Sequence, residues 1–294
     1  MPDVYSRIDG LANYDYQEFI VSSMIAAGWV DVSSSKSKDG YVLHSTGEDG
    51  TLDMYVGIKT HATDPIHTTY IRISMGMKYT PGASGTAGTW SVAMGEGYGT
   101  RTVFTQYQTD GERYKFFNRE APPTYYSVNK DRAIFIRLPN EYQWLTDTGS
   151  MYGCPGILGI GKPKLYYTPV GGRCMSLWGA GCPNTLANTL VMASTPSSDT
   201  NGALQVPIFD TLAGYPRATP DDNVAPLAKV YFGDTNNGLM GEIEMVRTVQ
   251  YQVSAGEIIT DGVYKYKTLL NMGDRPTLAP SITMYAIPVE KIVT

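Results

Sequence analysis

A turn signal between two strand-like runs near the C-terminus constrains the fold of this 294-residue chain more than any other feature. In GEIITDGVYKYKTLLNMG, residues 256–273, a TDG turn separates two runs rich in β-branched and aromatic residues. Asp-Gly between such runs is the strongest short-range hairpin signal, because glycine adopts a positive φ without steric cost. In the second run Tyr264 and Tyr266 lie two residues apart, so both are expected on one face of the strand. We therefore predict a β-hairpin here.

Further strand-like runs extend along most of the chain. Residues 41–61 form a predicted hairpin across GEDG, and NKD at residues 129–131 is expected to turn YYSV back into AIFIRL. The runs KVYFG and EIEMVRTVQYQV return to the strand pattern before the terminal hairpin. The chain contains 31 glycines and 18 prolines, which favour turns, and 22 tyrosines, which favour strands. These patterns predict a mainly β protein with β-sandwich or barrel-like sheets, one N-terminal amphipathic helix and long Gly/Pro-rich loops.

The one expected helix lies near the N-terminus, in YDYQEFIVSSMIAAGW. Asp15 stands at the N-cap position with Glu18 three residues later, which is the spacing of a capping box. Gly28 is a natural residue to follow the last turn. The predicted apolar face consists of Phe19, Ile20, Met24 and Ala27. We expect this face to pack on a sheet, and binding of the helix to a partner is the alternative.

Residues 146–226 differ in composition from the rest of the chain: they are rich in Gly, Pro, Thr, Asn and Ser and contain few periodic apolar runs. Loops of this length are functional or pack against neighbours. We interpret the span as extended surface segments that are ordered in an assembly. Two prolines in REAPPT, residues 119–124, suggest a boundary between a helix-plus-sheet domain at 1–120 and a β-rich domain with long loops at 121–294. A single domain is the alternative.

Charge and hydropathy argue against several classes of function. The net charge is −5 and no basic run is present. Because nucleic-acid binding depends on clustered basic residues, we expect no sequence-specific contact with nucleic acid. We recognise no signal peptide and no run of 18 apolar residues, so we expect no membrane partner and synthesis in a cytoplasm. The charged content of 17% is below the average of about 25%. A charge-poor surface rich in Tyr, Trp and Met suits a protein covered by neighbours.

The candidate metal and thiol residues lack the spacing of known sites. His61, Asp64 and His67 follow one another at intervals of three around a proline, which suits neither a helix face nor alternate strand positions. Cys174 and Cys182 have no second ligand pair, so free buried thiols or a disulfide formed after release are the two alternatives. Cys154 has no neighbour that would activate it. We expect no metal and no cofactor.

No catalytic motif stands out either. LGIGKPK and GEGYGTR resemble phosphate loops faintly, but neither has the required glycine spacing followed by a helical pattern. The pair Asp221 and Asp222 lies in a proline-bounded loop, where a solvated turn is expected. A glycosidase with acids on distant strands stays open as an alternative, because its two carboxylates need not be neighbours in sequence. We predict that the protein is not an enzyme.

The order and texture of these elements resemble structural proteins of tailed-bacteriophage virions, of the neck, tail and baseplate group. The resemblance covers most of the chain: a short helix ending at AGW, a sheet with MYVGIKT, the hairpin YYSVNKDRAIFIRL, a long Gly/Pro region, and GEIITDGVYKYKTLLN followed by MYAIPVE. None of these is a diagnostic motif. The resemblance implies a homo-oligomeric ring or collar, closed by heterologous contacts. In such proteins a terminal hairpin helps to form the subunit contacts.

The resulting expectation is a virion protein of the head–tail neck, assembled in the host bacterial cytoplasm, with copies of itself and other phage structural proteins as partners. A baseplate or tail-decorating protein and a carbohydrate-binding β-sandwich that contacts the host surface are the alternatives. The residues expected at interfaces are Tyr264 and Tyr266 in the hairpin, Tyr285 in the last strand and Trp178 in the Gly-rich loop.

Overall fold

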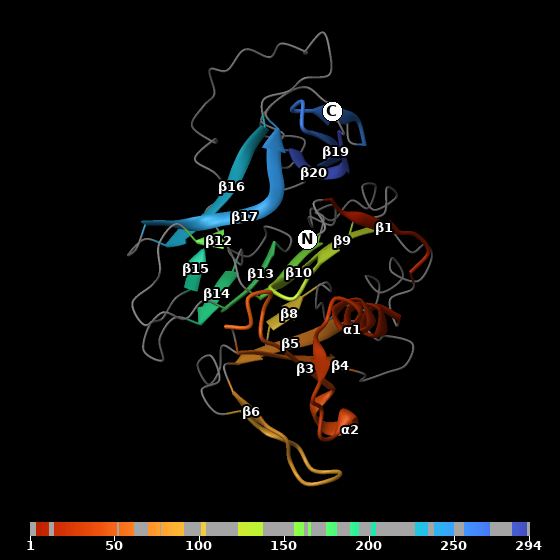
Figure 1. Ribbon diagram of the computed structural model, residues 1–294, viewed down its shortest axis with the longest axis vertical. Coiled ribbons are helices and arrows are strands. Elements are labelled where there is room, and N and C mark those ends of the chain that lie inside the picture. The colour runs from red at the N-terminus through yellow and green to blue at the C-terminus, as the bar shows by residue number, and fades with distance from the viewer. Residues whose placement is uncertain are drawn as a thin grey trace, which may run out of the picture.

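The computed structural model describes residues 4–11, 15–51, 53–61, 70–76, 78–90, 101–103, 123–137, 156–161, 164–165, 175–180, 189–193, 201–203, 227–234, 238–249, 256–270 and 284–292. Within these ranges the chain is mainly β, which confirms the predicted class. Three larger antiparallel sheets follow one another along the long axis in Figure 1. The N-terminal helix lies beside the lower of these sheets.

A five-stranded antiparallel sheet is formed, in this order, by β2 (Val30–Asp31), β3 (Tyr41–Ser45), β4 (Met54–His61), β5 (Tyr70–Gly76) and β8 (Arg101–Val103). The pairing of β3 with β4 confirms the hairpin predicted across GEDG. Between β2 and β3, KSKDG forms a single helical turn, α2 (Lys36–Asp39). A separate two-stranded ribbon pairs β6 (Tyr79–Thr80) with β7 (Thr89–Trp90).

A seven-stranded antiparallel sheet, called the central sheet here, is formed in order by β1 (Ser6–Ile8), β9 (Thr124–Val128), β10 (Arg132–Arg137), β11 (Gly156–Gly161), β13 (Met175–Ala180), β14 (Thr189–Ala193) and β15 (Asn201–Ala203). The β9–β10 pairing confirms the hairpin predicted around NKD. The Asn129 side-chain oxygen accepts the backbone N–H groups of Asp131 at 2.8 Å and Arg132 at 2.9 Å. These bonds close the turn locally, as Asn does in turns generally.

The C-terminal sheet is formed in order by β12 (Lys164–Leu165), β17 (Gly238–Val249), β20 (Met284–Lys291), β19 (Tyr264–Leu270) and β18 (Ile258–Thr260), and β16 (Leu227–Asp234) also pairs with β17. The β18–β19 pairing confirms the terminal hairpin, and β20 returns antiparallel to β19. The register between β16 and β17 shifts where Lys229 faces Arg247 and Val230 faces Ile243. Met245 lies within this bulge with φ +64. Bulges bend strands, and β17 is visibly curved in Figure 1.

Two parts of the predicted fold need correction. Residues 146–226 were expected to be loops, but five strands, β11 to β15, fall within that span. Glycines obscure the strand pattern in β11, β13 and β15, and pairing with neighbouring strands supplies the order that local sequence does not indicate. Each of the larger sheets also ends in edge strands within the described residues, so none is a closed barrel.

The predicted helix is α1 (Tyr16–Ala26), and its end is as expected. The N–H of Gly28 donates to Ile25 O at 2.9 Å and that of Trp29 to Met24 O at 3.1 Å, with Gly28 at φ +99. This is a Schellman C-cap. The predicted capping box is wrong. Asp15 is the N-cap residue but makes no side-chain capping bond, and the Glu18 carboxylate instead accepts the Tyr41 hydroxyl at 2.8 Å.

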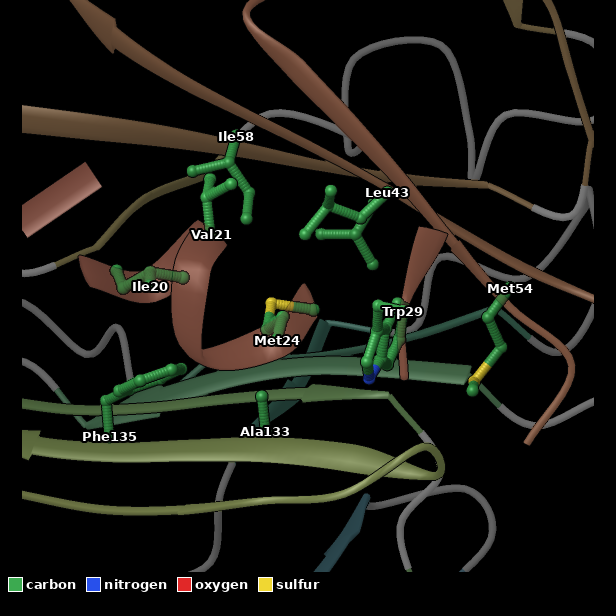
Figure 2. Packing of buried hydrophobic residues seen from close by; sticks show 10 residues of the cluster. Ile20, Val21, Met24, Trp29, Leu43, Met54, Ile58, Ala133 and Phe135 are labelled. Atoms are coloured by element: carbon green, nitrogen blue, oxygen red, sulfur yellow. The ribbon is translucent and has the colours of Figure 1, made fainter. Parts of the chain in front are cut away.

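The largest described hydrophobic cluster lies around α1, between the five-stranded sheet and the central sheet, as Figure 2 shows. Ile20, Val21 and Met24 point from the helix into it and are 0–3% exposed. Each such buried side chain stabilises the fold by about 1.5–3 kcal/mol. The cluster also contains Leu43 from β3 and Phe135 from β10, so it draws on both sides of the boundary expected near residue 120.

The central sheet meets the C-terminal sheet through its opposite face. Ser127 Oγ lies 3.7 Å from the sulfur of Met245, and Arg132 Nη2 lies 3.5 Å from the same sulfur. The backbone N–H of Tyr5, just before β1, donates to Pro288 O in β20 at 2.8 Å. We call this contact region the seam; it positions the terminal hairpin relative to the rest of the chain.

Candidate interaction surface

The TDG turn of the terminal hairpin is closed by side-chain hydrogen bonds. Asp261 Oδ1 accepts the backbone N–H groups of Val263 and Tyr264, each at 2.8 Å. Thr260 Oγ1 donates to Tyr264 O at 2.9 Å and accepts the N–H of Gly262, which has φ +88. The turn therefore has the glycine conformation that the sequence predicted. Side chains at its tip are held in defined positions by this network.

Tyr266 faces the interior of the chain rather than solvent. It is 3% exposed and belongs to a hydrophobic cluster with Val249, Ile259 and Ala286. Its hydroxyl group donates to Asp261 Oδ2 at 2.8 Å. Burial, together with the nearby Asp261 carboxylate, raises the pKa of Tyr266 well above its usual range. Little of this ring is left to touch another subunit, so its contribution is to support the hairpin from beneath.

The Asp261 carboxylate is held in its ionised form by the same turn. Partial burial alone would raise its pKa, but hydrogen bonds from the Tyr264 N–H, the Tyr266 hydroxyl and the Val263 N–H lower the pKa below the ordinary value for aspartate. A carboxylate that accepts several hydrogen bonds is expected to shift in this direction. Asp261 thus links the tip of the hairpin to its buried tyrosine.

Tyr264 shares a face with Tyr266, as the alternation predicted. The two ring centroids are 6.2 Å apart with the planes at 71°. Tyr264 is half-buried, and Lys291 Nζ lies 5.8 Å from the centre of its ring. Of the two hairpin tyrosines, Tyr264 keeps the ring surface that another molecule would contact.

The outer side of the hairpin exposes apolar side chains at the edge of a sheet. β18 is an end strand of the C-terminal sheet in the described residues. Ile258 is 44% exposed and Val263 is 52% exposed. Lys265 in β19 forms an ion pair with Glu290 in β20, with 2.7 Å between Lys265 Nζ and Glu290 Oε1. We call the surface formed by Ile258, Val263 and Lys265 the hairpin edge. Unpaired edge strands offer backbone groups for pairing with another chain.

The other two residues expected at interfaces are placed by their backbones alone. Tyr285 is in β20, opposite Thr248 of β17 and Leu269 of β19. Trp178 was expected in a loop, but it lies within β13, opposite Gly159 and Leu190. The Gly-rich flanks concealed this strand, since glycine is depleted in strands. Trp178 and the hairpin belong to different sheets.

Sequence patterns did not single out two features that the fold brings together. Ile258 and Val263 flank the turn, and only the strand register shows that they are exposed at an edge. His44 and Tyr55 of the five-stranded sheet stack with ring centroids 4.4 Å apart, and the row continues onto the β6–β7 ribbon, where the Tyr79 ring centroid lies 6.4 Å from that of Tyr55 and 5.1 Å from that of Trp90. Spacing along the sequence gives no sign of this row, because it runs across strands.

The remaining candidate residues fall largely outside the described ranges. Asp64, His67, the three cysteines and the pair at residues 221 and 222 lie outside them, and His61 is placed only as the last residue of β4. LGIGKPK begins in strand β11 rather than in a phosphate loop. Within the described ranges, no group of three or more His, Cys, Asp or Glu side chains is arranged to hold a metal ion.

Comparison with known proteins gives no family for this chain. No protein-family model matches it, and no curated protein matches it significantly. Of the helices in the described part of the chain, none is both long enough and apolar enough to span a membrane.

Proposed function

We propose that this chain is a non-enzymatic structural protein of a tailed-bacteriophage virion, which forms a homo-oligomeric ring or collar at the head–tail neck. The observation that carries the proposal is the hairpin edge: a sheet edge with exposed Ile258 and Val263 on a turn held by side-chain hydrogen bonds. A rigid edge of this kind favours association with another chain, because little conformational entropy is lost on binding.

The composition supports association on a larger scale. The chain contains 22 Tyr, 13 Met and 4 Trp but only 17% charged residues. Interface cores are enriched in Tyr, Trp and Met and depleted in charge. Tyr264 and, in the adjacent strand, Tyr285 extend the proposed contact, and Trp178 would belong to a second contact on the central sheet.

The finer fold is part of this proposal. The seam places one face of the central sheet against the C-terminal sheet through Met245 and Pro288. We take these two sheets to be the halves of a β-sandwich. Copies of the same chain would then meet through the hairpin edge on one side and a different surface on the other, since only heterologous contacts close a ring of more than two subunits. Other structural proteins of the virion would be the remaining partners. A baseplate or tail-decorating position is the alternative placement.

Sedimentation velocity of matched variants tests the role of the hairpin edge. Val263→Glu puts a charge at the proposed contact, whereas Val30→Glu puts the same charge at an equally exposed valine of β2, 57% exposed against 52%. We expect Val263→Glu to reduce the sedimentation coefficient to that of the monomer and Val30→Glu to sediment as the wild type. Assembly of Val263→Glu equal to that of the wild type would contradict the proposal.

The aromatic row that runs from the five-stranded sheet onto the β6–β7 ribbon favours one second candidate, a carbohydrate-binding module that contacts the host surface. His44, Tyr55 and Trp90 are partly exposed, and the His44 ring bonds to the exposed Asp53 carboxylate at 2.7 Å. Aromatic faces beside a hydrogen-bonding carboxylate suit the apolar faces and hydroxyl groups of a sugar. Saturable binding on a glycan array, lost in Trp90→Ala and kept in Val263→Glu, would favour this function. Absence of binding by the wild-type protein would exclude it.

A further inference from the structure

The seam buries a polar group that neither proposed function uses. Tyr5 is 4% exposed, and its hydroxyl group has no hydrogen-bond partner among the residues that the structure describes. Buried polar groups in folded proteins nearly always have partners, because a lost hydrogen bond to water must be replaced. The Tyr5 hydroxyl therefore points to a bound group that completes its hydrogen bonding.

Two arginines approach Tyr5 from different strands. The Tyr5 N–H is bonded to Pro288 of β20, and two residues earlier on that strand Ala286 lies opposite Arg247 of β17. From the central sheet, Arg132 reaches the same region and donates to the sulfur of Met245 at 3.5 Å. Strand pairing thus places the Arg247 backbone two residues from the strand position that Tyr5 contacts, and the Met245 contact places the Arg132 guanidinium at the seam.

The electrostatics agree with this placement. Burial raises the pKa of Tyr5 well above its usual range, while the charges of Arg132 and Arg247 act on the hydroxyl in the opposite direction. The hydroxyl is therefore protonated at neutral pH and available as a donor. Arg247 donates to the neighbouring Val246 carbonyl at 3.1 Å, and no ion pair of Arg247 is found in the part of the chain that the structure describes.

We propose that the seam binds a small tetrahedral oxyanion, phosphate or sulfate, between the guanidinium groups of Arg247 and Arg132 and the hydroxyl of Tyr5. A guanidinium offers several N–H donors in a planar fork that matches the oxygens of such an anion. The tyrosine hydroxyl adds a neutral donor. An anion held there would join β1, β10 and β17, and would stabilise the contact between the two sheets. The proposal is independent of ring formation.

The test is isothermal titration calorimetry of the full chain with inorganic phosphate, at constant ionic strength balanced with chloride. We expect saturable binding at one site. Tyr5→Phe, which changes only the hydroxyl, should weaken binding about tenfold. The matched control is Tyr125→Phe, which removes a buried hydroxyl on the neighbouring strand β9, where Tyr125 lies opposite Arg7 and the Arg7 guanidinium carbon is 5.9 Å from the centre of its ring. We expect this control to bind phosphate as the wild type does.

A second variant separates charge from geometry. Arg247→Lys keeps the positive charge but loses the fork, so binding should weaken although the net charge is unchanged. Near-ultraviolet circular dichroism of each variant checks that the fold is intact. The proposal is overturned if wild-type protein shows no saturable heat with phosphate. It is equally overturned if Tyr5→Phe and Arg247→Lys, both folded, bind phosphate as tightly as the wild type.

Discussion

The indole Nε1 of Trp29 donates a hydrogen bond to the backbone oxygen of Asn129 at 2.8 Å, across 100 residues of chain. Trp29 follows the Schellman cap of α1 and is 2% exposed. Asn129 begins the turn between β9 and β10, which its own side chain closes. One buried bond thus fixes the exit of the helix against the turn of the central hairpin.

Replacing Trp29 with Phe should destabilise the protein measurably. The change removes the indole donor and leaves the Asn129 carbonyl buried without that partner, which costs about 1–3 kcal/mol. Urea unfolding followed by circular dichroism measures the loss. Trp90→Phe, at a half-buried position on the β6–β7 ribbon, is the control and should cost less. Equal losses in both variants would contradict the role assigned to the Trp29 bond.

The shared core predicts that both halves of the chain unfold together. Leu43 and Phe135 are each 0% exposed in the same cluster, one on either side of residue 120. Leu43→Ala should cost about 2–5 kcal/mol and Phe135→Ala about 3–5 kcal/mol. Both variants should shift the same thermal transition in differential scanning calorimetry. Two transitions, each moved by only one variant, would instead support separate domains at 1–120 and 121–294.

Two glycines with the same φ should respond differently to substitution by alanine. Gly40 and Gly50 both have φ +72, but a Cβ on Gly40 would lie 2.4 Å from Ile58 O, whereas a Cβ on Gly50 would have nothing within 4 Å. Gly50→Ala should therefore cost about 1–2 kcal/mol from the left-handed conformation alone. Gly40→Ala should cost clearly more in urea unfolding, because the backbone of β4 must move and because Gly40 combines its positive φ with ψ −151, which alanine adopts only under strain. Equal costs in the two variants would contradict this account of Gly40.

The Asp261 turn predicts an acid-sensitive contribution to stability. Because the folded-state pKa of Asp261 is lowered, its carboxylate stabilises the fold above the ordinary aspartate pKa, about 3.9, and this contribution is lost as pH falls through the lower folded value. The stability difference between wild type and Asp261→Asn should therefore be constant near neutral pH and shrink below about pH 4. Urea unfolding at a series of pH values measures it. A difference that stays constant down to pH 2, roughly two units below the ordinary pKa, would contradict the assignment.

Local sequence patterns were sufficient to predict the structure where turn-forming residues separate two runs of alternating apolar and polar residues. TDG, NKD and GEDG each predicted a hairpin that the structure contains, and Gly28 ends α1 as expected. In these segments, hydrogen bonds between residues close in sequence determine the structure. The capping box failed for the opposite reason: a residue distant in sequence, Tyr41, donates its hydroxyl hydrogen bond to Glu18.

Long-range pairing accounts for what the sequence did not show. Strands β11, β13 and β15 contain glycine and β12 has only two residues, and the order of these strands depends on pairing with strands elsewhere in the chain. The same holds for the proposed interaction surface. Tyr264 and Tyr266 were expected to act alike, yet the register buries Tyr266 and leaves Tyr264 half-buried, while Ile258 and Val263 become the exposed edge. Exposure at a sheet edge depends on which strand has no neighbour, and one strand alone does not encode that.

The native mass of the wild-type protein at rising concentration, measured by light scattering after gel filtration, tests the central claim most directly. We predict a discrete multiple of the 32.1 kDa chain mass, with a closed ring visible by negative-stain electron microscopy. The multiplicity should stay constant as concentration rises further, since a closed ring has no free ends. A monomer at every concentration would contradict the proposal that the chain assembles with itself through the hairpin edge.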